Sequence, residues 1–311
     1  MAAVRTFVAR ALLAALTVWM LASGVFFATR LLPGDPAALV LGELSGPEER
    51  AALRAKLHLD EPIGAQYLRF ARSVATLDLG PSLSRPGTTA LERVRDAFPP
   101  TARLAAVAVV LGSIAGLLAA VLSVGPWLGT GRRWVNGTVI AIAATPLLAL
   151  APLATWILAV RTRIVPLPGD PSAGVAGLLF AAGLLAVPLG AQVARVGRAA
   201  LLDLGRAPFL DVARAKGATP ARTWIVHGLP AASAPIVAVI ATQLGALLGG
   251  AVVLERLFER PGLGTLMLEA YATRDLPVLE GAILASGALF VGTQALASAL
   301  HALIDPRVGR A

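Results

Sequence analysis

The sequence contains no cysteine and little charge: only 14% of its 311 residues are Asp, Glu, Lys or Arg. The absence of cysteine excludes a disulfide framework and a thiolate metal site. The three histidines fall in separate segments and share no ligand spacing, so we expect no metal site; they are His58, His227 and His301. No basic face interleaved with aromatic residues is present, which argues against nucleic acid as a partner.

Lysine occurs only twice, as Lys56 in Ala-Lys-Leu and Lys216 in Ala-Lys-Gly. A P-loop needs Gly-Lys-Ser/Thr, in which backbone amides cradle the phosphates and the lysine reaches them. Neither lysine fits this pattern, and the turn Pro261–Gly264 (PGLG) lacks the lysine altogether. The chain is therefore not expected to hydrolyse nucleotides itself.

What the sequence does contain is long uncharged windows, in a chain of mean hydropathy +0.75. Six stretches lack Asp, Glu, Lys and Arg: Ala11–Thr29, Leu104–Gly131, Trp134–Val160, Pro171–Ala194, Gly228–Leu254 and Gly281–Ile304. A helix needs about 20 apolar residues to cross a bilayer. The sequence thus predicts an all-α membrane protein with six transmembrane helices. The first window, with Arg5 and Arg10 before it, is longer than the apolar core of a signal peptide and is expected to be retained.

The distribution of basic residues predicts that both termini face the cytoplasm. The inner segments are then 1–10, 124–137, 195–227 and 305–311, which hold 12 Lys/Arg against three acids. The short outer loops, 161–172 and 255–280, hold five basic residues against six acids. Cytoplasmic loops are enriched in Lys and Arg, so this orientation is favoured over its inverse.

We divide the chain into four parts: 1–29 with the first helix, 30–100 as a small extracytoplasmic cap, 101–304 as the core with helices two to six, and 305–311 as a cytoplasmic tail. In the cap, Ser45–Glu49 reads as a helix start with an early proline and acids in the first turn. A second short helix is expected to include Gln66–Val74.

Prolines lie within several spans, namely Pro146 and Pro152 in the third, Pro188 in the fourth and Pro235 in the fifth. Each removes a helix hydrogen bond, and the result is either a hinge or merely packing geometry. No span carries an acid or base near its middle. Ion-coupled carriers usually keep such residues, which argues against an ion-coupled carrier. If the protein moves a solute uphill, the energy is expected to come from outside the membrane helices.

The segment DVARAKGATPARTWIVHGLP (Asp211–Pro230) differs from its apolar surroundings. Phe209–Lys216 is expected to form about two helical turns, which Gly217 ends in a left-handed conformation. Thr219 and Pro220 then read as the cap and first residue of a new helix that leads into the fifth span. Small residues at 213, 215 and 217 would let another surface approach, and the basic residues at 214 and 216 could pair with its acids.

This segment resembles the EAA loop of ABC-transporter membrane subunits, which reads Glu-Ala-Ala, three residues, Gly, nine residues, Ile-x-Leu-Pro. Asp211 replaces the glutamate, Val212 departs from the pattern, and His227 stands at the isoleucine. The dipeptide/oligopeptide/nickel (DppB/OppB-type) branch typically has ARAKG followed by histidine ten residues after the glycine, as here. Further blocks similar to that branch occur in order: Arg30–Gly42, Leu57–Phe70, Leu77–Gly87, Gly249–Gly281 and Ala302–Val308.

The resemblance implies an importer permease in a bacterial or archaeal inner membrane, whose loop 205–230 carries a coupling helix between helices four and five. The residues it assigns to ATPase coupling are Asp211, Ala213, Arg214, Ala215, Lys216, Gly217, Ala218, His227, Gly228, Leu229 and Pro230. It implies a second permease, identical or homologous, two ATPase subunits that bind ATP and Mg, and an extracytoplasmic solute-binding protein. The solute would be a peptide or a related small molecule such as a nickel chelate.

Two other classes of protein are alternatives. The first is a secondary carrier or channel that works without ATP, from which association with an ATPase through 211–217 would distinguish this chain. The second is an intramembrane hydrolase, which needs two aspartates or a serine with a histidine inside the bilayer, and the uncharged windows offer no such pair.

Overall fold

The computed structural model describes residues 2–31, 46–56 and 58–304. The chain divides into two compact units, one of residues 1–102 with 260–291 and one of residues 103–259 with 292–311. We call them unit 1 and unit 2 and describe each by itself. The described residues are almost all helical or in short turns, and an isolated bridge between Pro81 and Thr89 is the one extended pairing among them.

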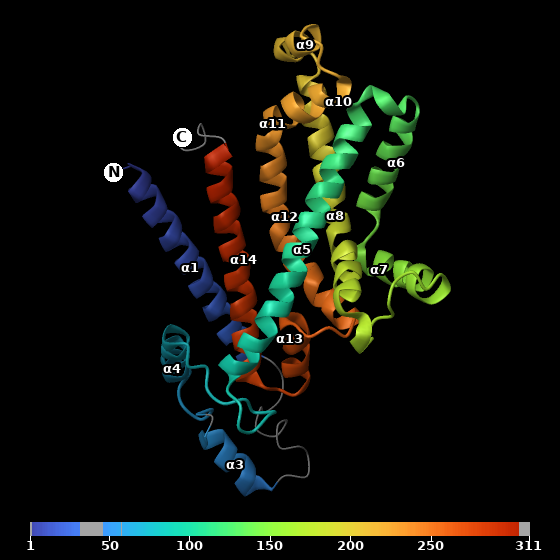
Figure 1. Cartoon of the computed structure of the whole chain (residues 1–311). Coiled ribbons are helices and arrows are strands. Elements are labelled where there is room, and N and C mark those ends of the chain that lie inside the picture. Colours follow the sequence, from blue (N-terminus) through green and yellow to red (C-terminus); the bar gives the residue numbers. More distant parts are fainter. Residues whose placement is uncertain (1, 32–45, 57, 305–311) are drawn as a thin grey trace. The chain divides into compact units, whose positions relative to one another are not determined.

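Unit 1 contains α1 (Ala2–Arg30), α3 (Pro47–Lys56), α4 (Ile63–Thr76), the start of α5 (Ala90–Val124), α13 (Leu263–Ala272) and most of α14 (Leu276–Ile304). Unit 2 continues α5 and adds η1 (Pro126–Leu128), α6 (Gly131–Ala144), α7 (Leu147–Thr155), η2 (Trp156–Arg161), η3 (Pro171–Ala173) and α8 (Gly174–Leu204). It also holds α9 (Pro208–Ala215), α10 (Pro220–Arg222), η4 (Thr223–Gly228), α11 (Leu229–Ala231) and α12 (Ser233–Leu257). Figure 1 labels most of these elements.

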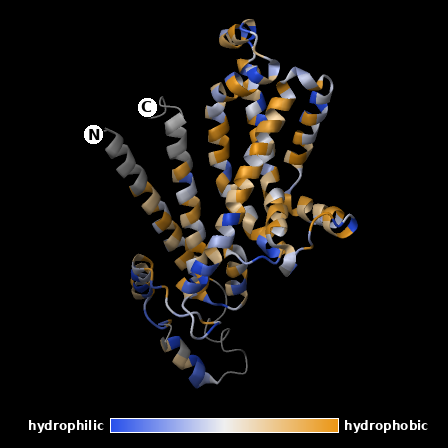
Figure 2. Cartoon of the chain, viewed as in Figure 1, coloured by the Kyte–Doolittle hydropathy of each residue, from blue (hydrophilic) through white to orange (hydrophobic). Residues whose placement is uncertain are grey.

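Five helices in the described residues are long and apolar enough to cross a membrane: Leu12–Arg30 of α1, α5, α8, α12 and Leu276–Leu296 of α14. Their apolar stretches form continuous bands along the ribbons, with polar residues gathered at the helix ends (Figure 2). The prediction of an all-α membrane protein is therefore confirmed.

The third predicted span is not one helix. It is a pair, α6 and α7 with η2, bent by 109° at a short break, and α7 runs sideways from the end of α6 (Figure 1). The cause lies at Pro146, because the residue before a proline avoids the helical region and Thr145 adopts φ −91° and ψ 121°. With 14 residues, α6 is about 21 Å long, less than the hydrocarbon thickness.

The other prolines have smaller effects. Pro152 and Pro188 lie inside α7 and α8, both of which continue past them. Pro235 stands in the first turn of α12, where its missing N–H interrupts nothing. Of the four positions, only Pro146 therefore coincides with a break in the helix.

Unit 2 is held together by a close contact between α5 and α8. A Cβ added to Gly112 would lie 2.8 Å from the Ala186 carbonyl oxygen, and one on Gly116 would lie 2.6 Å from the Gly190 oxygen. Only glycine lets the two backbones come this near. Small residues four apart are the usual means of close helix packing in membranes, where lipid weakens the hydrophobic effect between helices.

In unit 1 the predicted cap helices are present. α3 begins at Pro47 with Glu48 and Glu49 in its first turn, as expected, and Ser45 lies outside the described residues. α4 spans Ile63–Thr76 and packs on α1. The contact is aromatic: Phe26 lies 5.3 Å from Tyr67 and 5.2 Å from Phe70 between ring centroids. The Tyr67 hydroxyl also lies 2.7 Å from that of Ser23.

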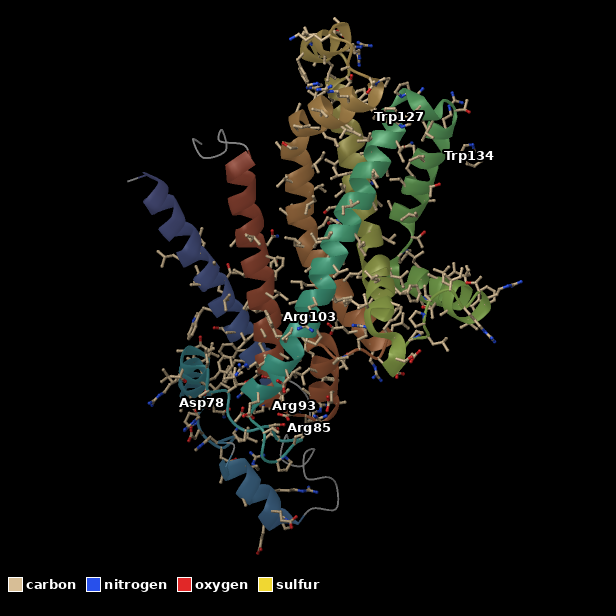
Figure 3. All side chains as sticks on the ribbon, in the orientation of Figure 1. Asp78, Arg85, Arg93, Arg103, Trp127 and Trp134 are labelled. Carbon is tan, nitrogen blue, oxygen red and sulfur yellow. The ribbon has the colours of Figure 1, made fainter. Side chains whose placement is uncertain are left out.

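A buried carboxylate joins the loop before α5 to the start of α14. Asp275 is fully buried and accepts hydrogen bonds from the Ser82 hydroxyl and from the Ser84 amide and hydroxyl, the latter two at 3.0 and 2.8 Å. The Arg93 guanidinium lies 3.6 Å from the same oxygen and 2.9 Å from Glu269. Figure 3 shows Arg93 beside Arg85, which also pairs with Glu269.

Burial disfavours the charged form of Asp275, but the hydrogen bonds from Ser82, the Ser84 and Leu83 amides and the Ser84 hydroxyl outweigh it. The pKa of Asp275 is therefore below its ordinary value. A carboxyl group with a lowered pKa in the folded state stabilises the fold at pH values above its ordinary pKa. That contribution disappears as the pH falls through the lowered pKa.

We predict that Asp275→Ala destabilises the protein by about 1–3 kcal/mol at neutral pH, because it leaves the Ser82 and Ser84 hydroxyls without their acceptor. Thermal unfolding in nanodiscs at pH 7 measures this effect, with Asp96→Asn, an exposed carboxylate of the same unit, as the control. The difference in melting temperature between Asp275→Ala and the wild type should shrink in strong acid, where Asp275 is protonated. Equal melting temperatures at pH 7 would show that Asp275 does not stabilise unit 1.

Candidate coupling segment

The segment 205–230 folds locally as the sequence predicted. α9 covers Pro208–Ala215, and Gly217 follows with φ +85°, a left-handed conformation that glycine adopts without strain. The Thr219 hydroxyl then accepts a hydrogen bond from the Arg222 amide at 3.3 Å and caps α10, whose first residue is Pro220. The helix stop and the new helix start are thus confirmed.

Beyond α10 the chain stays helical but changes its winding. η4 is a wider, π-type turn, and α11 follows before the chain enters α12. Figure 1 shows α9 projecting beyond the ends of α8 and α12, with α10 and α11 between it and the spans. The segment is therefore a small helical knob carried directly by two long helices.

One face of α9 packs against the rest of unit 2. Leu210 is fully buried and Ala213 is nearly so, and Leu210 belongs to the same core cluster as Leu201 of α8 and Trp224 of η4. A Cβ on Gly228 would lie 3.0 Å from the Trp224 ring, so the indole packs directly on that glycine. These contacts fix the orientation of α9 relative to α8 and η4.

The adjacent side of α9, about 100° around the helix, is exposed and apolar. Phe209 is 42% exposed and Val212 is 52% exposed. They are three residues apart and so lie on the same side of the helix, just as Leu210 and Ala213 share the buried side. Lys216, four residues after Val212, is exposed as well. Exposed apolar side chains next to a charged group form a surface suited to contact with another protein.

Several residues assigned from the sequence take up other positions. Ala213 faces the interior, so it cannot offer close approach to a partner, and Gly228 is also buried. Arg214 pairs with Asp211 of its own helix at 2.8 Å. The remaining assigned residues are exposed or half-buried: Ala215, Lys216, Gly217 and Pro230 are exposed, and Ala218, His227 and Leu229 are half-buried.

Sequence reasoning missed Phe209 and Val212 as surface residues. Their spacing was available as a signal, since Phe209/Val212 and Leu210/Ala213 form two offset pairs with the same three-residue interval. The sequence did not reveal which pair faces unit 2. That depends on the packing of Trp224, which is decided by tertiary structure.

The described residues contain no group of three or more His, Cys, Asp or Glu side chains placed to hold a metal ion. His58 and His227 are both half-buried, and the side chain of His301 lies outside the described set. Nothing at the coupling segment provides the ligands of a cofactor site.

The family described as "Binding-protein-dependent transport system inner membrane component" matches residues 90–310, which include the whole of this segment. The chain belongs to this family. The N-terminal part of such a system's membrane component matches residues 3–84. The chain is therefore a membrane permease subunit of an ABC transport system.

Relatives of the permease match along almost its full length. The glutathione transport system permease protein GsiC of Escherichia coli is 31% identical over 302 residues, which cover 94% of each chain. The dipeptide transport system permease protein DppB of Alkalihalophilus pseudofirmus is 30% identical, covering 91% of this chain and 92% of its own. These similarities confirm the likeness to the DppB/OppB-type branch.

A solved structure shares the fold at low sequence identity. A crystal structure of an amino acid ABC transporter with histidines superposes with a TM-score of 0.50 at 18% identity. The match covers 70% of the permease and 94% of the other chain.

We predict that Leu210→Ala detaches α9 from the permease, whereas Val212→Ala does not. Removing a fully buried leucine costs about 2–5 kcal/mol of packing, and an exposed valine contributes little to the fold. Hydrogen exchange of the amides in 208–217 distinguishes the two variants. Faster exchange in Leu210→Ala alone is expected, and equal exchange in both would contradict the assignment of the two faces.

Proposed function

We propose that this permease forms the translocation path for peptides, or for a related small solute such as a nickel chelate, delivered by an extracytoplasmic solute-binding protein. Full-length similarity to a glutathione permease and a dipeptide permease supports a peptide-like solute. Both of those solutes are short peptides. The permease would pair with a second, identical or homologous permease in the lipid bilayer of the inner membrane.

Energy comes from two separate ATPase subunits, which bind ATP and Mg, because neither lysine of the permease lies in a P-loop sequence. The observation that carries this proposal is the exposed face of α9. Phe209 and Val212 are exposed, although Leu210 of the same helix is fully buried. Full burial of an exposed side chain of this kind is worth about 1.5–3 kcal/mol, so covering the exposed half contributes roughly half of that.

The anchored face of α9 explains how a movement of the ATPase reaches the membrane. Leu210 and Trp224 belong to one packed cluster with Leu201 of α8 and Ile236 of α12. Packed cores transmit displacement because they resist compression. A pull on α9 would therefore move the cytoplasmic ends of α8 and α12 together.

The orientation we propose places both termini, and residues 124–137 and 205–230, in the cytoplasm. Within unit 2, Trp127 lies at the same end as α10 (Figures 1 and 3), so the two predicted inner loops lie at one end of the unit. At the other end, the Gly169 amide donates to the Phe258 carbonyl at 3.1 Å. That bond joins the two predicted outer loops, and the basic residues favour this end as the outside.

We predict that Gly217→Arg abolishes solute uptake while the variant still inserts into the membrane. The side chain would strain a backbone at φ +85° and project into the open space where the ATPase docks. Gly129→Arg is the matched control, because Gly129 also has a positive φ, of +48°, and no atom near its Cβ position.

Uptake of labelled peptide into cells, normalised to the amount of permease in the membrane, compares the two variants. We expect a loss only for Gly217→Arg. Normal uptake by that variant would contradict a coupling role and favour a carrier that works without ATP.

A further inference from the structure

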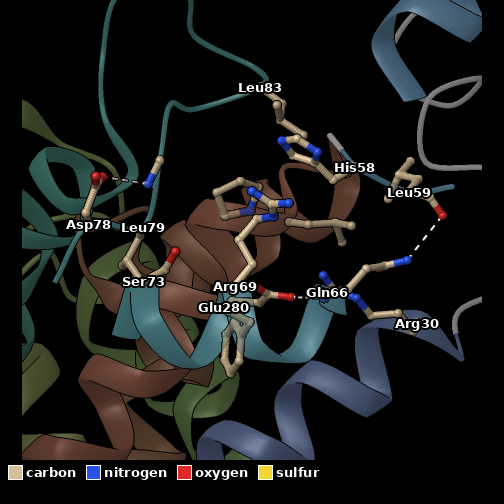
Figure 4. Close-up of a pocket in the computed structure, with 14 residues that line it drawn as sticks. Arg30, His58, Leu59, Gln66, Arg69, Ser73, Asp78, Leu79, Leu83 and Glu280 are labelled. Carbon is tan, nitrogen blue, oxygen red and sulfur yellow. Dashed lines mark hydrogen bonds and ion pairs between the residues drawn. The ribbon is translucent and has the colours of Figure 1, made fainter. Parts of the chain in front are cut away.

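Unit 1 contains a cavity of about 280 Å³ that the coupling and translocation roles do not use. α4, the turn after it and the start of α14 form its walls (Figure 4). Its size is near the lower end of the range for small-molecule sites. The lining is mixed, with Phe70, Leu79, Leu83 and Pro277 as apolar surface and with charged groups of both signs.

Two acids line the cavity, Asp78, which is exposed, and Glu280 of α14, which is buried. The Glu280 side chain is nine-tenths buried, with 10% exposed. The Oε1 atom accepts hydrogen bonds from Thr29 and Arg30. No described residue donates to Oε2, and a half-satisfied buried carboxylate facing a cavity is a site for a cationic donor.

Two arginines line the cavity, Arg30 and Arg69. Arg30 is paired with Glu280, which leaves Arg69 of α4 as the second positive group. The Arg69 Nη2 atom donates to both carboxylate oxygens of Glu61, at 2.8 and 2.9 Å. Within the described part of the chain, its Nε and Nη1 atoms donate to no acceptor. A guanidinium held in place on one edge, with its other edge unused, suits a carboxylate ligand. Figure 4 shows Arg69 and Glu280 among the residues around the cavity.

From these features we infer that the cavity binds a small zwitterion with an apolar body, such as a dipeptide. Its ammonium group would bind Glu280, its carboxylate would bind Arg69, and its side chains would lie on Phe70 and the leucines. This inference rests on the proposed function, and it adds a solute site on the cap segment 30–100. The site includes the ends of the α1 and α14 spans, on the side from which the solute arrives in the proposed orientation.

The test is binding of labelled alanyl-leucine to the full chain, purified in nanodiscs with the subunits that accompany it, without nucleotide or solute-binding protein. Equilibrium dialysis gives the affinity. Arg69→Gln should weaken binding by about tenfold or more, the usual effect of losing a charged hydrogen bond. The matched control is Arg72→Gln, which removes the same charge from an exposed position of α4 that does not line the cavity.

Glu280 is paired with Arg30, so its substitution could disturb folding, and we therefore test the ammonium contact through the ligand. N-acetyl-alanyl-leucine lacks the ammonium and alanyl-leucinamide lacks the carboxylate. Each should compete with labelled alanyl-leucine at least tenfold less well than the unmodified dipeptide. Equal competition by all three compounds would overturn the inference.

The failure of this inference can be distinguished from failure of the proposed function. Gly217→Arg should bind the dipeptide as the wild type does, although it transports none. Absence of binding, or equal weakening in Arg69→Gln and Arg72→Gln, overturns the cavity site even if cells take up the peptide. Absence of peptide uptake by the wild type overturns the proposed function instead.

Discussion

The close approach of α5 and α8 at Gly112, Gly116 and Gly190 is the constraint on which unit 2 depends. Inside a bilayer, lipid chains cover apolar side chains as well as another helix does, so two helices associate only if their backbones fit closely. A Cβ atom on Gly112 or Gly116 would overlap a carbonyl oxygen of α8, and one on Gly190 would lie only 3.2 Å from the Gly112 oxygen. With α5 fixed on α8, the α12 helix packs along α8 and the core cluster forms around Leu185 and Leu189.

The coupling segment extends this packing beyond the membrane. α8 ends next to Trp224, and Trp224 and Leu210 link α9 to the same cluster that contains the glycine-packed helices. The segment thus has two roles on adjacent sides of a helix of eight residues. One face joins the permease core, and the other leaves Phe209 and Val212 uncovered for a partner. The charged residues between them pair on the helix itself, as Asp211 and Arg214 do.

Much of the fold could be predicted from the sequence, because its causes are local. Uncharged windows indicate the spans, and Gly217 and Thr219 indicate where α9 ends and α10 begins. Pro146 was predicted only as a hinge or as packing geometry, because a proline alone does not fix the angle between the helices it separates, which here is 109°. The orientation of α9 was not predictable for a similar reason. Ala213 looked like a contact residue by type, but burial against unit 2 removes it from the surface.

The most direct test of the central claim is to place a single cysteine at Val212 of this cysteine-free chain. A thiol-specific crosslinker in inside-out vesicles from the native host would then capture the neighbouring protein, identified by mass spectrometry. Leu128→Cys, an exposed apolar position in the other predicted cytoplasmic loop, serves as the control. The account predicts that Val212→Cys alone captures an ATPase with a Gly-Lys-Ser/Thr loop. Labelling of Val212→Cys without such an ATPase, or labelling only from the outside, would contradict it.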